Sequence, residues 1–447
     1  MKGPYYIKEY GTICVGNSNN DFESGKLEID SESFKSLTNF IEENENQDDF
    51  EKAFSISQKK GIRYINVKNY VGVIETKQGV VIEILPKTFI GENDEQANVD
   101  EAKMLLLAML KTLKNSPFVN LNFAHLKEKK NFPILEVFIS SFLAELNKLI
   151  RKELRGDYVK IENNNSYLKG KLLFKEHLKY NSFNKAKFYC EFDEFNFDIP
   201  PNRLIKSTLS RLFLLATSNL NKKQIVKYLQ YFDSVNFCNN ITADLAYCNS
   251  RSRALNNYGN LIIWSEIFLK NKSFTNFHGN SINQAVLFPM EKLFESYIAF
   301  LLKKYCDSDI IDAQDKRYCL ISQHSDKKDL NYSLNKFSLK PDIVINSHEI
   351  IIDTKWKILN VNSKKYDIKE SDIYQMHAYG KRYQEGNKDN TVPRLGLIYP
   401  RNPNFQEKLF QMRYGQDLLL DIIPFNFGNK DAAQEIRKIV TIFKDNV

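Results

Sequence analysis

The sequence lacks the signatures of several common protein classes. Its six cysteines form no C-x-x-C pair and no Cys/His knuckle spacing, so we expect no structural zinc site. No G-x-x-x-x-G-K-(S/T) loop is present, and we therefore do not expect the chain to hydrolyse nucleotides itself. The N-terminus has no apolar stretch typical of a signal peptide, and the longest apolar run, residues 104–110, is too short to span a bilayer. We accordingly expect a cytoplasmic protein with reduced thiols and no membrane partner.

The composition is that of a folded protein with more than one domain. A chain of 447 residues is longer than one core usually serves, so we expect two or three domains. Apolar residues make up 43% and charged residues 26%, which excludes a mostly disordered chain. The net charge of +8 suits contact with a phosphate backbone but does not require it.

Three regions can be separated along the chain, and together they predict a multidomain α+β fold. Residues 1–125 carry β-branched runs and a glycine turn at 61–86, which predict a β-rich domain. Residues 126–280 show apolar side chains at helical spacing after Pro133, which predicts a mainly helical middle region. Residues 281–447 alternate helix and strand, which predicts an α/β domain. The elements expected there are a helix at 289–305, strands near 338–346 and 349–356, a helix at 371–385 and a strand at 395–399.

The most informative stretch is residues 339–357, where two β-rich runs flank a polar segment. A two-residue loop at 347–348 would place Asp342 opposite Asp353 on the paired strands. Period-2 alternation then puts both carboxylates and Lys355 on one face of the hairpin. Two carboxylates directly across a ladder repel each other, and a protein tolerates this arrangement when a cation lies between them.

Magnesium would account for such an acidic pair. Mg²⁺ prefers hard oxygen ligands and keeps several waters, and it can polarise a phosphate and lower the pKa of a bound water. A neighbouring lysine can position that water or offset charge on the phosphate. The alternative is a solvent-exposed hairpin whose charges have no function, but runs as apolar as residues 350–352 are usually buried. The hairpin register that places Asp342 opposite Asp353 also pairs Val344 with Ile351.

Pro341-Asp342 followed by Asp353-Thr354-Lys355 resembles the P-D…(D/E)-x-K motif of the PD-(D/E)XK phosphodiesterases. In its context the sequence is similar to the McrC family, the nuclease subunits of McrBC-type, 5-methylcytosine-specific restriction systems. The resemblance covers most of the chain in order. The matching segments are residues 70–74, 82–87, 168–171, 191–203, 287–297, 339–344, 353–357, 375–379 and 397–400.

This resemblance implies a fold, an activity and partners. It implies that residues 281–447 form a PD-(D/E)XK restriction-endonuclease-like domain and that the chain is a Mg²⁺-dependent endodeoxyribonuclease of antiphage defence. It also implies a McrB-like AAA+ GTPase ring that binds the GTP and moves double-stranded DNA. Residues 1–125 would dock on that ring and stimulate its GTPase, and self-association within the complex would allow both DNA strands to be cut.

The resemblance and the hairpin geometry together assign the catalytic residues. We expect Asp342 and Asp353 to be metal ligands and Lys355 to position the attacking water. Glu295 fits the family's Leu-Phe-Glu pattern and would supply a third acidic ligand from the preceding helix. Glu291 lies one turn earlier on the same face and competes for that role, and either glutamate could simply be an exposed helix residue.

Two groups of residues outside the hairpin also match family patterns. Gln375 and Tyr379 are four residues apart on one helical face, and the resemblance implies that they flank the active site and support it. The alternative is an amphipathic helix with a half-buried tyrosine. Glu194, Asp198 and Arg203 match a pattern of the middle region, for which we expect buried hydrogen-bonding roles.

Two other functions remain to be weighed against a nuclease. The chain could be a non-catalytic adaptor that activates the AAA+ motor and retains only a vestigial nuclease site. It could also be an autonomous nucleic-acid-binding protein. The intact set of Asp342, Asp353 and Lys355 favours the nuclease, and the mild charge without a reader motif disfavours the autonomous binder.

Overall fold

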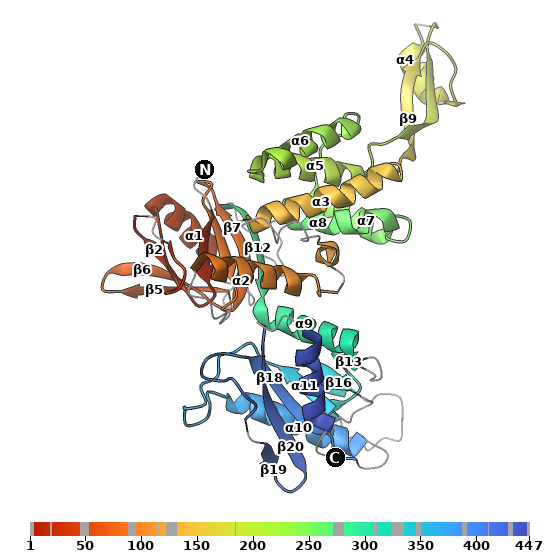
Figure 1. The fold of residues 1–447 in the computed structure, drawn as a ribbon. Helices are drawn as coiled ribbons and strands as arrows, with labels where there is room; N and C mark the ends of the chain where they lie inside the picture. Colours follow the sequence, from red (N-terminus) through yellow and green to blue (C-terminus); the bar gives the residue numbers. More distant parts are fainter. Residues whose placement is uncertain are drawn as a thin grey trace. The chain divides into compact units, whose positions relative to one another are not determined.

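The computed structural model of the chain divides into two compact units, and each is described by itself (Figure 1). The first unit comprises Met1–Val119, Lys129–Asn131 and Ser273–Val447, and the second comprises Asn120–Glu128 and Phe132–Lys272. The two terminal regions of the sequence therefore share one unit. The three predicted domain ranges, 1–125, 126–280 and 281–447, remain a prediction. The structure describes residues 4–17, 20–44, 53–87, 95–114, 116–121, 132–183, 185–270, 281–306, 311–322, 335–345, 350–386, 391–409, 411–427 and 432–444.

The N-terminal part of the first unit is built on two sheets. Its elements are β1 Tyr5–Lys8, β2 Thr12–Val15, β3 Asn20–Asp21, β4 Lys26–Ile29, α1 Ser31–Glu43, β5 Phe54–Lys59, β6 Ile62–Val67, β7 Tyr70–Thr76, β8 Val81–Leu85, α2 Glu95–Leu110 and the 3₁₀ helix η1 Pro117–Asn120, with β12 Ile282–Pro289 from later in the chain. The strand orders are β3-β4-β2-β6-β5 and β1-β8-β7-β12. The hairpin predicted within residues 61–86 is confirmed, because β7 and β8 pair antiparallel around Gly79, whose φ is +76°.

Strand β12 connects the N-terminal sheet to the helix that carries Glu295. It pairs antiparallel with β7, and Leu287 lies opposite Gly72. Gly72 has φ +139°, and a Cβ atom there would meet the carbonyl oxygen of Val286 at 2.0 Å, so this close approach requires glycine. The chain then enters α9, Met290–Tyr305, with Pro289 at the N-cap, which confirms the predicted helix.

The rest of the first unit is a six-stranded mixed sheet with helices on both faces. Its elements are β13 Ile311–Ala313, β14 Cys319–Ser322, β15 Asn335–Ser338, β16 Ile343–Ile345, β17 Ile350–Thr354, α10 Glu370–Gly386, β18 Arg394–Pro400, β19 Met412–Tyr414, β20 Leu418–Phe425 and α11 Ala432–Lys444. The sheet order is β13-β16-β17-β18-β20-β19, and β18 pairs parallel with both β17 and β20. Strands β14 and β15 form a separate antiparallel pair.

Burial on both faces explains the apolar character of the central strands. Val344, Ile351 and Leu397 belong to one buried cluster with Met376 of α10. On the opposite face, a Cβ atom at Gly396 would meet the ring of Phe443 in α11 at 2.4 Å. A strand covered on both sides needs a near-continuous apolar sequence, which accounts for the isoleucine run that opens β17.

The hairpin register predicted from sequence alternation is confirmed. Strand β16 pairs antiparallel with β17, and Val344 lies opposite Ile351. The predicted loop at residues 347–348 lies outside the described residues. The ladder begins one residue after Asp342, so it stops one pair short of the predicted Asp342–Asp353 pairing. The same register nevertheless brings the two aspartates to the same end of the hairpin.

The second unit combines helices with a three-stranded sheet. Its elements are α3 Ile134–Arg151, β9 Asp157–Asn165, β10 Lys171–Leu172, α4 Phe174–Asn181, β11 Phe188–Asn196, α5 Pro200–Leu215, α6 Asn219–Leu229, the 3₁₀ helix η3 Gln230–Phe232, α7 Ile241–Ser250, the 3₁₀ helix η4 Asn256–Tyr258 and α8 Gly259–Leu269. The expected helices are present, but the sheet β10-β11-β9 is not predicted by the sequence, because β9 is mostly exposed and polar and β11 has only two buried positions. Within this unit, β9 and α4 project away from the helices (Figure 1).

The motif of the middle region is less buried than expected. Arg203 Nε donates to Asp198 Oδ1 at 2.9 Å, and the backbone N–H of Asn236 donates to the same oxygen at 3.0 Å. Asp198 and Arg203 are half-buried and keep the expected hydrogen-bonding role. The expectation of a buried role is wrong for Glu194, which is exposed on β11 because that part of the strand has no layer packed over it.

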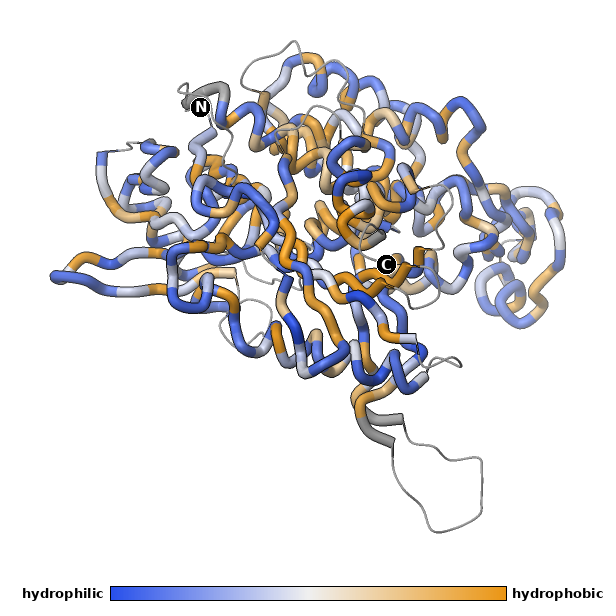
Figure 2. The backbone as a smooth tube through the Cα atoms, turned by 60° about the horizontal axis from the view of Figure 1, so that its bottom comes forward, coloured by the Kyte–Doolittle hydropathy of each residue, from blue (hydrophilic) through white to orange (hydrophobic). Residues whose placement is uncertain are grey.

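Apolar and hydrophilic segments alternate closely along the chain (Figure 2). Among the residues that the structure describes, no helix combines the length and the apolar character needed to cross a membrane.

Candidate active site

The residues predicted to form the site come from three parts of the first unit. All of them lie within the described ranges, at one end of the β16–β17 hairpin and on the two helices beside it. Asp342 directly precedes β16, Asp353 lies in β17, Lys355 directly follows β17, Glu295 lies on α9, and Gln375 and Tyr379 lie on α10.

Asp342 is fixed across the hairpin by the strand that carries the second aspartate. Its Oδ2 accepts hydrogen bonds from the backbone N–H and the hydroxyl of Thr354, each at 2.7 Å. Burial, and after it the charge of Glu295, raises the pKa of Asp342 to about 6, although the Thr354 hydrogen bonds and Lys355 act in the opposite direction. The carboxylate of Asp342 is therefore well oriented, but the positive charge near it is too small to hold its pKa at the ordinary value.

Asp353 is the most buried member of the group, with an exposed fraction of 1%. Its Oδ2 lies 2.5 Å from Lys355 Nζ. Burial, and after it the charge of Asp342, raises the pKa of Asp353 to about 7 despite this ion pair. One lysine thus does not offset the combined effect of burial and of the charge of Asp342.

Glu295 joins this cluster, whereas Glu291 does not. Glu295 Oε1 accepts a hydrogen bond from Gln314 Nε2 at 2.8 Å, and its pKa is raised by burial and by the charge of Asp353. The charge of Glu291 acts instead on Glu9, which lies in the N-terminal part of the unit. Of the two competing glutamates, the structure brings Glu295 to the aspartates.

Gln375 and Tyr379 form a hydrogen-bonded support for the lysine. Lys355 Nζ donates to Gln375 Oε1 at 3.0 Å, and Gln375 Nε2 donates to the Tyr379 hydroxyl at 2.7 Å. The hydroxyl in turn donates to the carbonyl oxygen of Lys340 at 3.1 Å. Tyr379 is buried, and burial and the charge of Asp353 raise its pKa, so it remains a protonated donor. This chain of bonds fixes the position of the amine relative to Asp353.

The donor set matches what a hard divalent cation requires. The charge of Lys355 acts on Asp342, Asp353 and Glu295, and Lys292 acts on Glu295 as well, so three acids face two amines and the cluster carries excess negative charge when its acids are ionised. Within the described ranges, no three His, Cys, Asp or Glu side chains already converge as a metal centre. Mg²⁺ does not need such a cage, because it is commonly held by one or two carboxylates together with waters and substrate phosphates. The residues present therefore fit this ion.

Two residues that contact the site region were not found from the sequence. Trp356, which directly follows Lys355, donates its indole N–H to Glu9 Oε1 at 2.5 Å in a buried environment. Glu9 also accepts from the backbone N–H of Lys87, and burial raises its pKa to about 7. Glu9 lies 347 positions before Trp356, so no local sequence pattern could indicate the contact.

Asp372, which lies near the start of α10, makes further contacts that were not predicted from the sequence. Lys357 Nζ lies 2.6 Å from Asp372 Oδ2, and the Tyr399 hydroxyl donates to the same oxygen at 3.4 Å. The charge of Asp372 also reaches Asp353 and Lys355. Asp372 therefore adds to the negative character of this end of the sheet, although its own charge is paired.

Comparisons with known proteins agree with this architecture. The family model of the McrBC 5-methylcytosine restriction system component matches residues 65–400, well over half of the chain. No curated protein is significantly similar to the chain. A chain from a tetradecameric assembly of Thermococcus gammatolerans McrB AAA+ hexamers with bound McrC superposes with a TM-score of 0.67 at 15% identity, covering 98% of this chain and 99% of that chain. At that identity the likeness concerns the fold, which is a mixed α/β multidomain architecture.

A chain of the Thermococcus gammatolerans McrBC complex, solved by cryo-EM, gives a TM-score of 0.48 at 17% identity and covers 68% of this chain and 88% of that chain. The resemblance inferred from the motifs is confirmed by the match of the family model. The protein belongs to the family of McrBC 5-methylcytosine restriction system components.

Proposed function

We propose that this chain is the nuclease subunit of a McrBC-type restriction complex and that residues 281–447 contain a PD-(D/E)XK active site. The observation that carries the proposal is that Asp353 is buried against Lys355, with the charges of the half-buried Asp342 and Glu295 acting on the same group. Burial and mutual repulsion raise the pKa values of the three acids, a pattern typical of functional sites. A cluster that served only to stabilise the fold would be more stable with a further cation or with fewer acids. The excess of acids therefore supports a functional role.

The residues of the proposed site divide the chemistry between them. Asp342 and Asp353, with Glu295 beside them, would hold Mg²⁺, which when bound polarises a phosphate oxygen and acidifies a bound water. Burial opposes the charge of Lys355, but Asp353 and Asp342 raise its pKa above the usual lysine value, so it is an ammonium group. It can donate hydrogen bonds to the attacking water or to a phosphate oxygen, but it has no lone pair with which to accept the water's proton.

The proposed partner is a McrB-like AAA+ GTPase ring. The support for it is the family match together with a solved chain of the same fold, which comes from an assembly of McrB AAA+ hexamers with bound McrC. In this proposal the ring binds and hydrolyses GTP and moves double-stranded DNA, and this chain stimulates the GTPase and cuts the DNA. Docking through residues 1–125 and self-association of two nuclease subunits are part of the same proposal.

The decisive experiment compares cleavage and GTPase stimulation in the reconstituted complex. The full chain is combined with its GTPase partner, GTP, Mg²⁺ and methylated duplex DNA. Asp353→Asn should lower the cleavage rate by more than about a hundredfold while GTPase stimulation stays near the wild-type level. Asp342→Asn should behave in the same way. Glu385→Gln is the matched control, because it makes the same chemical change at an exposed position of α10.

The outcomes separate the nuclease from an adaptor. Cleavage that survives in Asp353→Asn and Asp342→Asn would remove these residues from the active site. A wild-type complex that stimulates GTP hydrolysis but leaves the DNA intact would identify the chain as a non-catalytic adaptor. Cleavage lost in both variants, but kept in Glu385→Gln, would establish the proposed site.

A further inference from the structure

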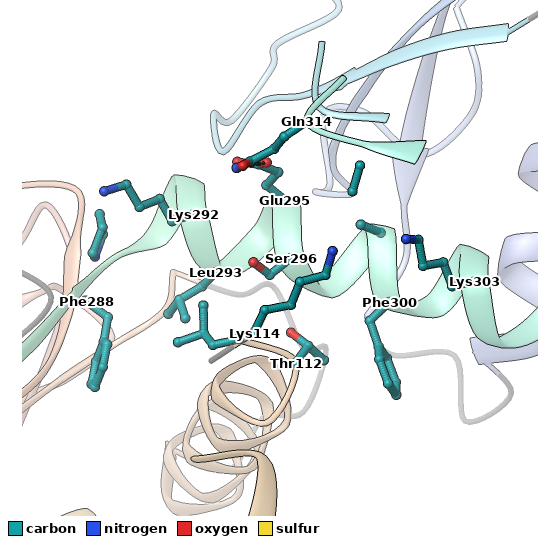
Figure 3. Close-up of a pocket in the computed structure, with 14 residues that line it drawn as sticks. Thr112, Lys114, Phe288, Lys292, Leu293, Glu295, Ser296, Phe300, Lys303 and Gln314 are labelled. Carbon is teal, nitrogen blue, oxygen red and sulfur yellow. Dashed lines mark hydrogen bonds between the residues drawn. The ribbon is translucent and has the colours of Figure 1, made fainter. Parts of the chain in front are cut away.

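A cavity of about 300 Å³ lies beside α9 in the first unit (Figure 3). Its walls come from residues 112–114, which follow α2, from the end of β12, from α9, and from the end of β13 with Gln314. Glu295 also lines the cavity, and Figure 3 shows it next to Gln314 on one side of α9. Glu295 therefore belongs both to the lining of the cavity and to the acidic cluster.

Three lysines from two regions of the sequence line this cavity. Lys292 and Lys303 lie on α9, and Lys114 comes from the segment after α2. All three are exposed, and none forms an ion pair with a carboxylate in the part of the chain that the structure describes. Lys114 reaches from its own segment onto α9, toward Lys303 (Figure 3). These amines together attract a ligand that carries negative charge.

The remaining lining of the cavity is largely apolar and includes an exposed aromatic ring. Leu113, Leu293 and Phe288 are buried and form part of its wall. Phe300 also lines the cavity, and 45% of its surface is exposed. An exposed ring beside lysine side chains is the combination that proteins use to stack a nucleotide base while binding its phosphate.

We propose that this cavity binds one unstacked nucleotide of the DNA strand next to the cleavage site. The phosphate of that nucleotide would contact Lys114 and Lys303, and its base would stack on Phe300. Pockets for small ligands begin near 300 Å³, so the cavity has room for one nucleotide but not for a longer segment. The proposal rests on the proposed nuclease function, because the neighbouring acids require a phosphodiester substrate.

One consequence concerns the N-terminal part of the chain. Lys114 belongs to the region that the sequence assigns to partner docking, and it lines the same cavity as Glu295. The N-terminal region would then hold DNA as well as dock on the ring. Lys114→Ala should therefore change DNA binding by the isolated full chain, in which no partner is present.

The test is equilibrium binding of the full chain to labelled DNA in Ca²⁺ in place of Mg²⁺, as a function of salt. The probes are a duplex, the same duplex with one unpaired nucleotide, and free dTMP as competitor. Lys114→Ala and Lys303→Ala should each lower the slope of log K against log salt by about 0.7–0.9. Phe300→Ala should weaken binding of the unpaired probe about fivefold or more and leave the plain duplex less affected. Lys35→Ala, an exposed lysine of α1 outside the cavity lining, is the matched control.

The outcomes distinguish this proposal from the nuclease proposal. Unchanged affinity and salt slope in the lysine and Phe300 variants would overturn the nucleotide site, even if Asp353→Asn abolishes cleavage. Competition by dTMP that depends on Phe300, without any effect on DNA, would also overturn it, since the cavity would then serve a free nucleotide. Loss of binding in Asp353→Asn is not expected, because the lysines and Phe300 remain in place in that variant.

Discussion

Two lysine–carboxylate pairs in the first unit differ in how deeply the amine is buried. In the N-terminal part, Lys103 Nζ lies 3.0 Å from Glu83 Oε2, and both side chains are fully buried. The amine also lies 4.3 Å from the centre of the Tyr6 ring. In the candidate site, Lys355 Nζ lies 2.5 Å from Asp353 Oδ2, but Lys355 is 19% exposed and further acids lie close by.

This difference distinguishes a structural ion pair from the ion pair of the proposed active site. A fully buried pair of opposite charges has little net effect on stability as long as both partners are present. The candidate site sets Asp342, Asp353 and Glu295 against Lys355, and the pKa values of Asp342 and Asp353 rise to about 6 and about 7. Such an imbalance destabilises the protein without metal and favours the binding of a cation.

The largest effect on stability is expected at the fully buried pair of Lys103 and Glu83. Glu83→Gln removes the carboxylate that Lys103 pairs with, in a place without exposure to water, and should lower the free energy of unfolding by about 3–5 kcal/mol. Urea denaturation of the full chain measures this change. The double variant Glu83→Leu with Lys103→Met should recover most of the loss, since it removes both charges. A loss below about 1 kcal/mol in the single variant would show that the pair is not structural.

The corresponding substitution at the pair of Lys355 and Asp353 should raise the free energy of unfolding rather than lower it. Asp353→Asn removes one of several repelling charges and should raise the free energy of unfolding of the metal-free protein by roughly 1–3 kcal/mol at pH 8. Urea denaturation in EDTA provides the measurement. Asp372→Asn is a suitable comparison, because that acid is paired with Lys357 and its loss should destabilise the protein. If Asp353→Asn were as destabilising as Glu83→Gln, the distinction between the two pairs would be lost.

The raised pKa of Asp353 should also make the stability of the metal-free protein depend on pH. An acid whose pKa is higher in the folded state binds its proton more tightly there, so its contribution to stability falls as pH rises. For Asp353 this fall extends from the ordinary pKa of 3.8 to a pKa of about 7, and the contribution of this group to stability is constant above that. Melting temperatures recorded in EDTA across this range should decline less steeply in Asp353→Asn. Added Mg²⁺ should stabilise the wild type most above pH 7, where the acids are ionised, and stabilise Asp353→Asn little.

The sequence predicts those parts of the fold that depend on local alternation. The pairing of Val344 with Ile351 follows from two apolar runs and a short loop, and the structure has this register. The helix after Pro289 follows from its position before an apolar periodic segment. The sheet formed by β9, β10 and β11 lacks such a signal, because β9 is mostly exposed and polar and only Cys190 and Phe192 of β11 are buried. The addition of β12 to the N-terminal sheet depends on a distant partner, β7, and so has no local signal either.

The candidate site divides in the same way. Asp342, Asp353 and Lys355 lie on one hairpin, so their shared position can be predicted from spacing alone. The choice between Glu295 and Glu291 requires the position of α9 relative to the hairpin, which the sequence does not contain. The contact of Glu9 with Trp356 also depends on tertiary structure.

The smallest effect is expected at the outer end of the support for Lys355. Tyr379→Phe removes the hydroxyl between Gln375 and the Lys340 carbonyl, but Gln375 keeps its own bond to Lys355. One lost hydrogen bond of about 1 kcal/mol corresponds to a cleavage rate about fivefold lower, measured in the reconstituted complex at saturating DNA. Tyr374→Phe makes the same change on the same helix at a side chain that is 70% exposed, and it should cleave like the wild type. A Tyr379→Phe variant as inactive as Asp353→Asn would mean that the hydroxyl acts on the substrate itself, whereas full activity would show that Gln375 alone is sufficient to orient the amine.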